Sequence, residues 1–170
     1  MFKDKGSLKK LKVTKILFFF ITFLFLFSGI AFAENVVSFL GKSLDDKNIK
    51  SFMDGLNEEP IVRKDYITSG YTLYIYRMNG INLGFKDGVL YDIAIDSRFK
   101  KEANLPGDIN FLDSRESINK KLGNPTEAYD DLKVKGTKLP VFEIWKHPDY
   151  TIRITYSKAT GKMSSFSISK

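Results

Sequence analysis

Residues 72–95 read TLYIYRMNGINLGFKDGVLYDIAI, and this stretch decides what kind of fold the chain adopts. It contains three runs rich in β-branched, aromatic and leucine residues: TLYIY (Thr72–Tyr76), INLGF (Ile81–Phe85) and VLYDIAI (Val89–Ile95). Asn79-Gly80 separates the first two runs and Asp87-Gly88 the last two, and such dipeptides favour tight hairpin turns. The stretch therefore predicts three strands of an antiparallel meander.

A short helix is predicted ahead of this meander. Ser43 stands three residues before Asp46, which is the spacing of a side-chain cap followed by an acid. Apolar residues then recur at helical spacing, at Ile49, Phe52, Met53 and Leu56. Pro60 marks the end of the helical segment.

The second half of the chain follows a similar plan. Asp113 and Glu116 form a possible capping box, and Gly123 stops the segment that they begin. Three more strands are predicted at Val141–Trp145, Tyr150–Tyr156 and Lys162–Ile168, with turns at Pro148-Asp149 and Thr160-Gly161. We therefore expect an α+β fold built of two repeats, about 36–97 and 105–170. Each repeat would be a helix followed by a three-stranded antiparallel meander, with the helices on one face of the sheet.

Alternation along the strands predicts which sheet face is open to solvent. In the run Ile81–Phe85 the apolar residues point one way and the polar ones the other, as in a sheet with one packed face. The same parity directs Leu73, Ile75, Phe142 and Ile144 inward. The candidate partner-binding residues on the open face are then Tyr74, Tyr76, Asp92, Trp145 and Arg153. Tyrosine, tryptophan and arginine are enriched at interface hot spots; the alternative is that these rings pack between the repeats or beneath a loop.

Residues 1–33 have the three parts of a signal peptide. A lysine-rich segment ends at Lys15, an apolar run covers Ile16–Phe27, and Ala31-Phe32-Ala33 places small residues where signal peptidase cleaves. Cleavage after Ala33 leaves residues 34–170 as a single exported domain, periplasmic or secreted. The alternative is an uncleaved membrane anchor, because the 18 residues from Ile16 to Ala33 can just span a bilayer.

Composition argues against a nucleic-acid partner. The chain has a formal net charge of +7, but six of its lysines and only one acid lie in residues 1–33. Residues 34–170 keep 21 basic and 19 acidic residues, a net charge of +2, without the basic clustering that nucleic-acid binding requires. The chain contains no cysteine, which excludes disulfides, thiol chemistry and a lipid-modified N-terminus. These 137 residues are enough to bury a core without disulfides.

No pattern in the sequence predicts catalysis. The single histidine, His147, precedes Pro148 in an expected turn and has no nucleophile motif to serve. Acidic pairs such as Asp45-Asp46 fall at caps and loops, where a solvated surface explains them. Neither a glycine-rich phosphate loop nor the ligand spacing of a calcium loop is present. We therefore expect no catalytic residue, no metal site and no cofactor, with a carboxylate-based hydrolase as the remote alternative.

The order of helices and strands resembles two known groups of proteins. Helix-plus-meander in tandem is similar to the secreted β-lactamase inhibitor proteins and, as a single copy, to the small lipoproteins of the outer-membrane barrel assembly machine. Three strings of the second half, LPGDINF (Leu105–Phe111), DSR (Asp113–Arg115) and LGNP (Leu122–Pro125), resemble predicted immunity proteins of bacterial toxins. The resemblance spans Phe39 to Ile168, and the chain lacks the lipid-accepting cysteine of the assembly lipoproteins.

This resemblance implies a protein that docks another protein on its open sheet face. We expect an exported, non-enzymatic inhibitor or immunity protein, whose partner is a toxin, a hydrolase or an envelope component. The alternative is a structural or assembly factor of the bacterial cell envelope. In either case the membrane is involved only through the leader, if it is not cleaved.

Overall fold

The structure is a computed structural model that describes residues 36–65, 68–99, 105–130, 133–134, 137–138 and 140–170. The signal peptide predicted at residues 1–33 lies outside the described residues. The helical segments are η1 (Val36–Phe39), α2 (Lys47–Asp54), η2 (Pro106–Asp108) and α3 (Arg115–Leu122). The strands are β1 (Ile61–Lys64), β2 (Tyr71–Tyr76), β3 (Ile81–Lys86), β4 (Val89–Asp96), β5 (Glu127–Tyr129), β6 (Lys133–Val134), β7 (Thr137–Lys138), β8 (Val141–Lys146), β9 (Thr151–Tyr156) and β10 (Met163–Ser169).

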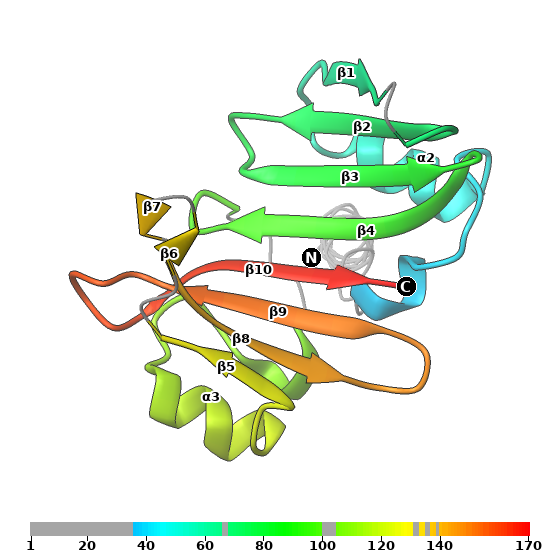
Figure 1. The fold of residues 1–170 in the computed structure, drawn as a ribbon. Coiled ribbons are helices and arrows are strands. Elements are labelled where there is room, and N and C mark those ends of the chain that lie inside the picture. Colours follow the sequence, from blue (N-terminus) through cyan, green and yellow to red (C-terminus); the bar gives the residue numbers. More distant parts are fainter. Residues whose placement is uncertain (1–35, 66–67, 100–104, 131–132, 135–136, 139) are drawn as a thin grey trace, which may run out of the picture. The chain divides into compact units, whose positions relative to one another are not determined.

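One eight-stranded antiparallel sheet dominates the described residues (Figure 1). Its strand order is β1-β2-β3-β4-β10-β9-β8-β5, so that β4 and β10 lie side by side in the middle. Strands β6 and β7 form a separate two-stranded ladder. The predicted α+β fold of two helix-plus-three-strand repeats is wrong. The structure is mostly sheet, β1 and β5 extend it at both edges, and the pairing of β4 with β10 joins both halves into one sheet.

Local signals place the six predicted strands correctly to within one residue at each end. Asp87 and Gly88 both have positive φ, 52° and 77°, as a two-residue turn between twisted strands requires. The predicted helix caps lie elsewhere. Asp46, rather than Ser43, accepts hydrogen bonds at the start of α2, from Asn48 N and Ile49 N at 2.8 and 3.3 Å.

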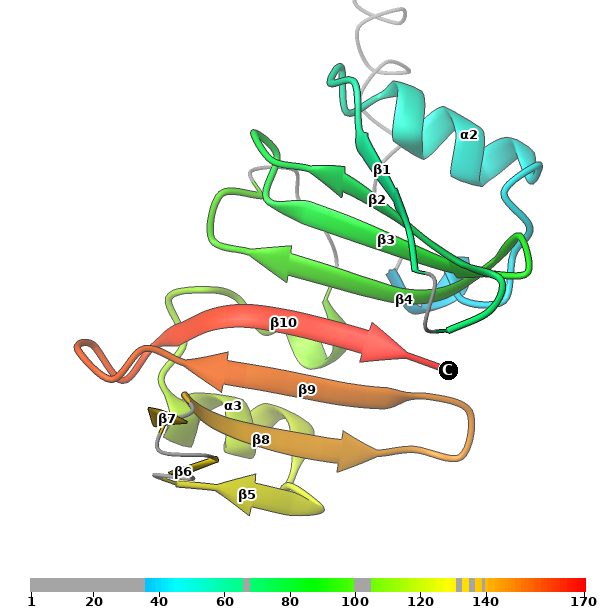
Figure 2. The same ribbon diagram turned by 45° about the horizontal axis from the view of Figure 1, so that its top comes forward.

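The core lies between one sheet face and both α-helices. Residues that pair across an antiparallel ladder point to the same face. One such row runs through Tyr74, Leu83, Ile93, Ile168, Ile152 and Trp145. Apolar side chains of α2 (Ile49, Phe52) and α3 (Ile118) are buried in the same cluster as most of this row, with Tyr74 packed against it. Figure 1 shows α2 behind β2 and β3, and Figure 2 shows α3 behind β8. We call this side the helix-covered face and the opposite side the uncovered face.

Candidate binding surface on the uncovered sheet face

One row of paired residues crosses all eight strands on the uncovered face. It runs through Ile61, Ile75, Asn82, Ala94, Ser167, Arg153, Ile144 and Glu127. Apolar side chains stand toward both edges, at Ile75 and Ile144, while the middle strands carry small ones. None of these eight residues belongs to the core cluster. In this row, isoleucines of β2 and β8 thus flank the smaller side chains of the middle strands.

The structure places only two of the five predicted binding residues on this face. Asp92 pairs with Gly84 and Ser169, and Arg153 with Ile144 and Ser167, on the uncovered side. Asp92 and Arg153 lie on strands separated by β10 and no contact joins them.

Tyr74, Tyr76 and Trp145 lie on the helix-covered face, so the prediction that they face solvent is wrong. Tyr76 and Trp145 are only 2% and 3% exposed. The Tyr74 ring meets the Phe85 ring edge-on, with centroids 5.3 Å apart. Trp145 Nε1 donates a hydrogen bond to the Gly123 carbonyl at the end of α3, at 3.0 Å. Tyr76 and Trp145 are therefore part of the core, and Tyr74 packs against it.

Arg153 is a charged group of the uncovered face that packs on an aromatic ring. Its guanidinium carbon lies 4.0 Å from the centroid of the Phe142 ring, which in turn stacks on Tyr129 at 4.6 Å. Arg153 is exposed, and none of the described carboxylates forms an ion pair with it. Stacking on an aromatic face orients a guanidinium without using its hydrogen-bond donors. We call Tyr129, Phe142 and Arg153 the arginine platform.

The edge of this platform is polar and fixed. Glu127 accepts a hydrogen bond from the Tyr129 hydroxyl at 2.6 Å and forms an ion pair with Lys146. The hydrogen bond from Lys146, and after it the one from Tyr129, lowers the pKa of Glu127. Glu127 is therefore ionised at neutral pH, and it holds the ring of Tyr129 in place. Sequence reasoning missed Tyr129 and Phe142 because β5 was not predicted and Phe142 was assigned to the core.

A second polar pair lies over β2–β4 on the same face. The Tyr71 hydroxyl donates a hydrogen bond to Asp92 directly above Gly84, and a Cβ at Gly84 would collide with both groups. Burial raises the pKa of Asp92, and the hydrogen bond from Tyr71 opposes that shift. Burial and the bond to Asp92 also raise the pKa of Tyr71. No cationic side chain pairs with Asp92 among the described residues.

On the helix-covered face, a buried carboxylate anchors α3. Glu143 is 1% exposed and is the one charged residue that is buried among those described. Its oxygens accept from Arg115 Nε of α3 and from the Tyr156 hydroxyl of β9, each at 2.7 Å. Arg115 also pairs with Asp130 at 2.8 Å. Because every contact is internal, this cluster holds the fold together.

The other residues considered for catalysis, His147 and the acidic pair Asp45-Asp46, take part in local contacts. His147 stacks on Tyr150 in the turn between β8 and β9, with centroids 4.5 Å apart. Asp45 pairs with Lys50 at the surface, at 2.7 Å. Within the described ranges, no three His, Cys, Asp or Glu side chains are grouped to hold a metal ion. Across the same residues, no helix has the length and apolar character needed to cross a bilayer.

Comparisons with known proteins show the fold alone. No family model matches the chain, and no curated protein is similar to it in sequence. A cysteine-rich secretory protein from Staphylococcus aureus matches with a TM-score of 0.53 and 19% identity, over 81% of this chain and 46% of that one. An extracellular protein containing an SCP domain from Bacillus anthracis matches with a TM-score of 0.56 and 8% identity, over the same shares.

A DUF4309 family protein from Bacillus subtilis also matches, over 71% of this chain and 76% of that one, at 15% identity. Its TM-score of 0.41 is too low to support an argument. The chain spans less than half the length of the first two structures. Its fold is therefore similar to part of two proteins that are described as secretory and extracellular.

Proposed function

We propose that residues 34–170 form an exported, non-enzymatic domain that binds another protein on the uncovered sheet face, with the arginine platform at the centre of the contact. One observation carries this proposal. Arg153 is exposed, has no carboxylate partner among the described residues, and is oriented by the Phe142 ring at 4.0 Å. An arginine that is already oriented loses little conformational entropy on binding, and arginine and aromatic residues dominate interface hot spots.

Export is supported by the leader and by the similar structures. Residues 1–33 have the composition of a cleavable signal peptide ending at Ala33. Two proteins of similar fold are described as secretory and extracellular. We infer that the mature domain acts in the periplasm or outside the cell.

We favour a function in which binding inhibits the partner protein. An inhibitor or immunity protein presents a rigid surface, and a wide antiparallel sheet with a fixed arginine offers one. The second candidate is an assembly factor of the cell envelope, which would bind a structural protein on the same face. The two differ in whether the partner is an active hydrolase or toxin.

The test is affinity capture with matched variants. The full chain, expressed with its leader and purified in the mature form that the host releases, is immobilised and exposed to envelope and secreted fractions. Arg153→Glu reverses the charge on the platform, while Arg77→Glu makes the same change in the turn between β2 and β3. We expect one stoichiometric protein on the wild type and on Arg77→Glu, and its loss on Arg153→Glu.

Each outcome decides a part of the proposal. Retention of the same protein by Arg153→Glu would show that the uncovered face is not the contact. Capture of no protein by the wild type would contradict protein binding itself. Capture of a hydrolase or toxin whose activity falls when the wild type is added would support the inhibitor function. Capture of a structural envelope protein would instead support the assembly function.

A further inference from the structure

A second site lies away from the arginine platform, in an acidic hollow between the end of α2 and the start of β1. The hollow has a volume of about 470 Å³. Three carboxylate side chains line it, those of Asp54, Glu58 and Glu59, and no lysine or arginine does. Met53, Pro60 and Tyr76 supply apolar walls. We call this site the acidic hollow.

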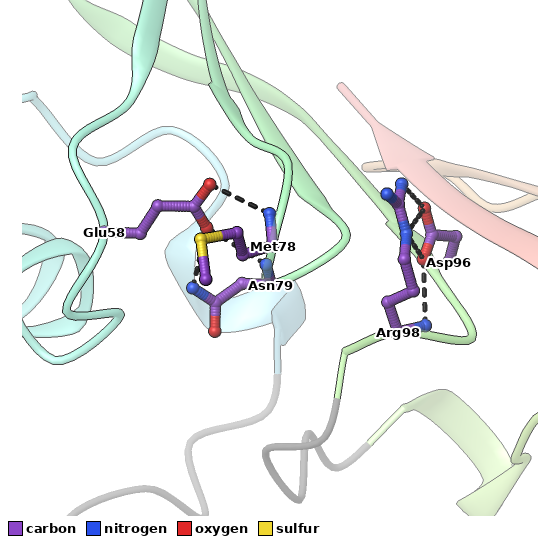
Figure 3. Close-up of polar contacts among 5 residues, drawn as sticks. All are labelled: Glu58, Met78, Asn79, Asp96 and Arg98. Carbon is purple, nitrogen blue, oxygen red and sulfur yellow. Dashed lines mark hydrogen bonds and ion pairs between the residues drawn. The ribbon is translucent and has the colours of Figure 1, made fainter.

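Glu58 is a fixed negative charge at its wall. Its carboxylate accepts hydrogen bonds from Met78 N at 2.8 Å, from Asn79 N at 3.0 Å and from Asn79 Nδ2 at 2.8 Å (Figure 3). Burial alone raises the pKa of Glu58, but these hydrogen bonds outweigh it and lower the pKa. Glu58 therefore stays ionised, and the three hydrogen bonds orient its carboxylate.

Tyr76 adds a polar group without a partner. It is 2% exposed, it lines the hollow, and its hydroxyl forms no hydrogen bond within the described part of the chain. Burial, and after it the neighbouring groups Tyr74, Asp54, Glu58 and Glu59, raise the pKa of Tyr76 to about 12. The hydroxyl is therefore free to accept a hydrogen bond from a group that enters the hollow.

The negative charge of the hollow is only partly offset from within the fold, because Arg98 attracts Glu58 without forming an ion pair with it. Asp54 and Glu59 form no ion pair with any described residue. Of the nearby arginines, Arg98 is engaged by Asp96 in three hydrogen bonds from its side chain (Figure 3). Arg77 does not line the hollow. A cation from outside the described chain would complete the charge balance.

We propose that the acidic hollow binds the side chain of an arginine from a partner protein. The carboxylates are not grouped closely enough for a metal ion among the described residues, whereas a guanidinium spreads five donors over a planar fork. Asp54 and Glu59 have free oxygens, and the Tyr76 oxygen has a free lone pair. Met53 and Pro60 can pack against the aliphatic stem.

The surroundings favour a protein partner over a free cation. Pro60 lines the hollow and leads directly into β1, which is an edge strand with one unpaired side in the described sheet. Ile61 and Val62 of this strand are 39% and 50% exposed. An extended segment that approached this edge would gain apolar and main-chain contacts beside the hollow.

The test uses N-acetyl-arginine amide as the probe, with two analogues. Amide and tyrosine chemical shifts of the full chain, purified in its released mature form, are followed by NMR during titration. We expect saturable shifts confined to residues 53–60 and Tyr76, weaker shifts with N-acetyl-lysine amide, and none with the neutral citrulline analogue. Equal effects of the arginine and citrulline analogues, or no saturable shift, would overturn the proposal.

Variants separate this site from general electrostatic attraction. Asp54→Asn combined with Glu59→Gln should weaken binding of the arginine probe by about tenfold, because both charged acceptors are lost. Asp149→Asn combined with Glu116→Gln removes the same two charges at exposed sites elsewhere, and should leave binding unchanged. Equal weakening by both double variants would refute a specific site. Because all four positions are at the surface, the folding of either variant is not at risk.

Discussion

Two tyrosine–carboxylate pairs lie on opposite faces of one sheet, and their surroundings differ. Glu143, on the helix-covered face, is 1% exposed and accepts from both Arg115 and Tyr156. Asp92, on the uncovered face, accepts from Tyr71 and pairs with no described cation. A buried charge is tolerated when a counter-charge and hydrogen bonds compensate it. The Glu143 cluster meets this condition and the Asp92 pair does not, which suggests that the first serves the fold.

The largest expected effect comes from removing the cation of the compensated pair. Arg115→Ala leaves Glu143 buried with one hydrogen bond, and should lower the free energy of unfolding by about 3 kcal/mol. Urea denaturation of the wild type and the variant measures this. Replacing the whole cluster by apolar residues, Arg115→Met with Glu143→Leu and Tyr156→Phe, should restore most of the loss. A cost below about 1 kcal/mol for Arg115→Ala would show that Glu143 does not depend on its counter-charge.

An intermediate effect is expected at Gly84, above which the other pair meets. Gly84→Ala places a Cβ against the Tyr71 hydroxyl and the Asp92 carboxylate, and should cost about 1–3 kcal/mol through overcrowding. In a Tyr71→Ala background the same substitution should cost clearly less, because one of the crowding groups is gone. Equal costs in the two backgrounds, measured by urea denaturation, would mean that the strand itself rather than the pair requires glycine.

Prediction from sequence failed to identify which side of β2 and of β8 is buried. Strand positions followed from local signals, namely alternation and the turn dipeptides, and these are physical properties of neighbouring residues. The face of β2 did not, because Leu73–Tyr76 is apolar or aromatic at every position and carries no alternation. In β8 the pattern misled, because a charged residue, Glu143, points inward. Its partner Arg115 is 28 residues away, and no local rule connects them.

The edge strands and most of the candidate site residues were not predicted, for a related reason. β1 and β5 have only four and three residues, so they show almost no period. Without β5, Tyr129 could not be placed beside Phe142 and Arg153. The acidic hollow requires Tyr76 to lie on the helix-covered face, whereas the sequence analysis placed it on the open face. Arg153 and Asp92 were placed correctly because the flanking residues Ile152, Ile154 and Ile93 alternate clearly with them.

The smallest expected effect is the pH dependence of the stability that Asp92 contributes. Burial raises the pKa of Asp92 above its ordinary value of 3.8. A carboxyl group with a raised pKa in the folded state stabilises the fold fully below pH 3.8, and this contribution is lost as the pH rises through the raised pKa. Asp92→Asn has no charge to bury and can still accept from Tyr71. It should therefore unfold with a higher free energy than the wild type at pH 7, and the gain should vanish below pH 3.8.

Urea denaturation between pH 3 and pH 8 tests this sign, with Asp87→Asn as the control at an exposed acid of the same hairpin. The control should show no gain that grows with pH. Glu143→Gln should act in the opposite direction to Asp92→Asn at pH 7, since it removes the charge that Arg115 needs. Loss of stability in both variants would mean that Tyr71 alone compensates Asp92. A gain for Asp92→Asn alone would show that the uncovered face carries a charge at a cost to the fold, as expected of a residue kept for contact with a partner.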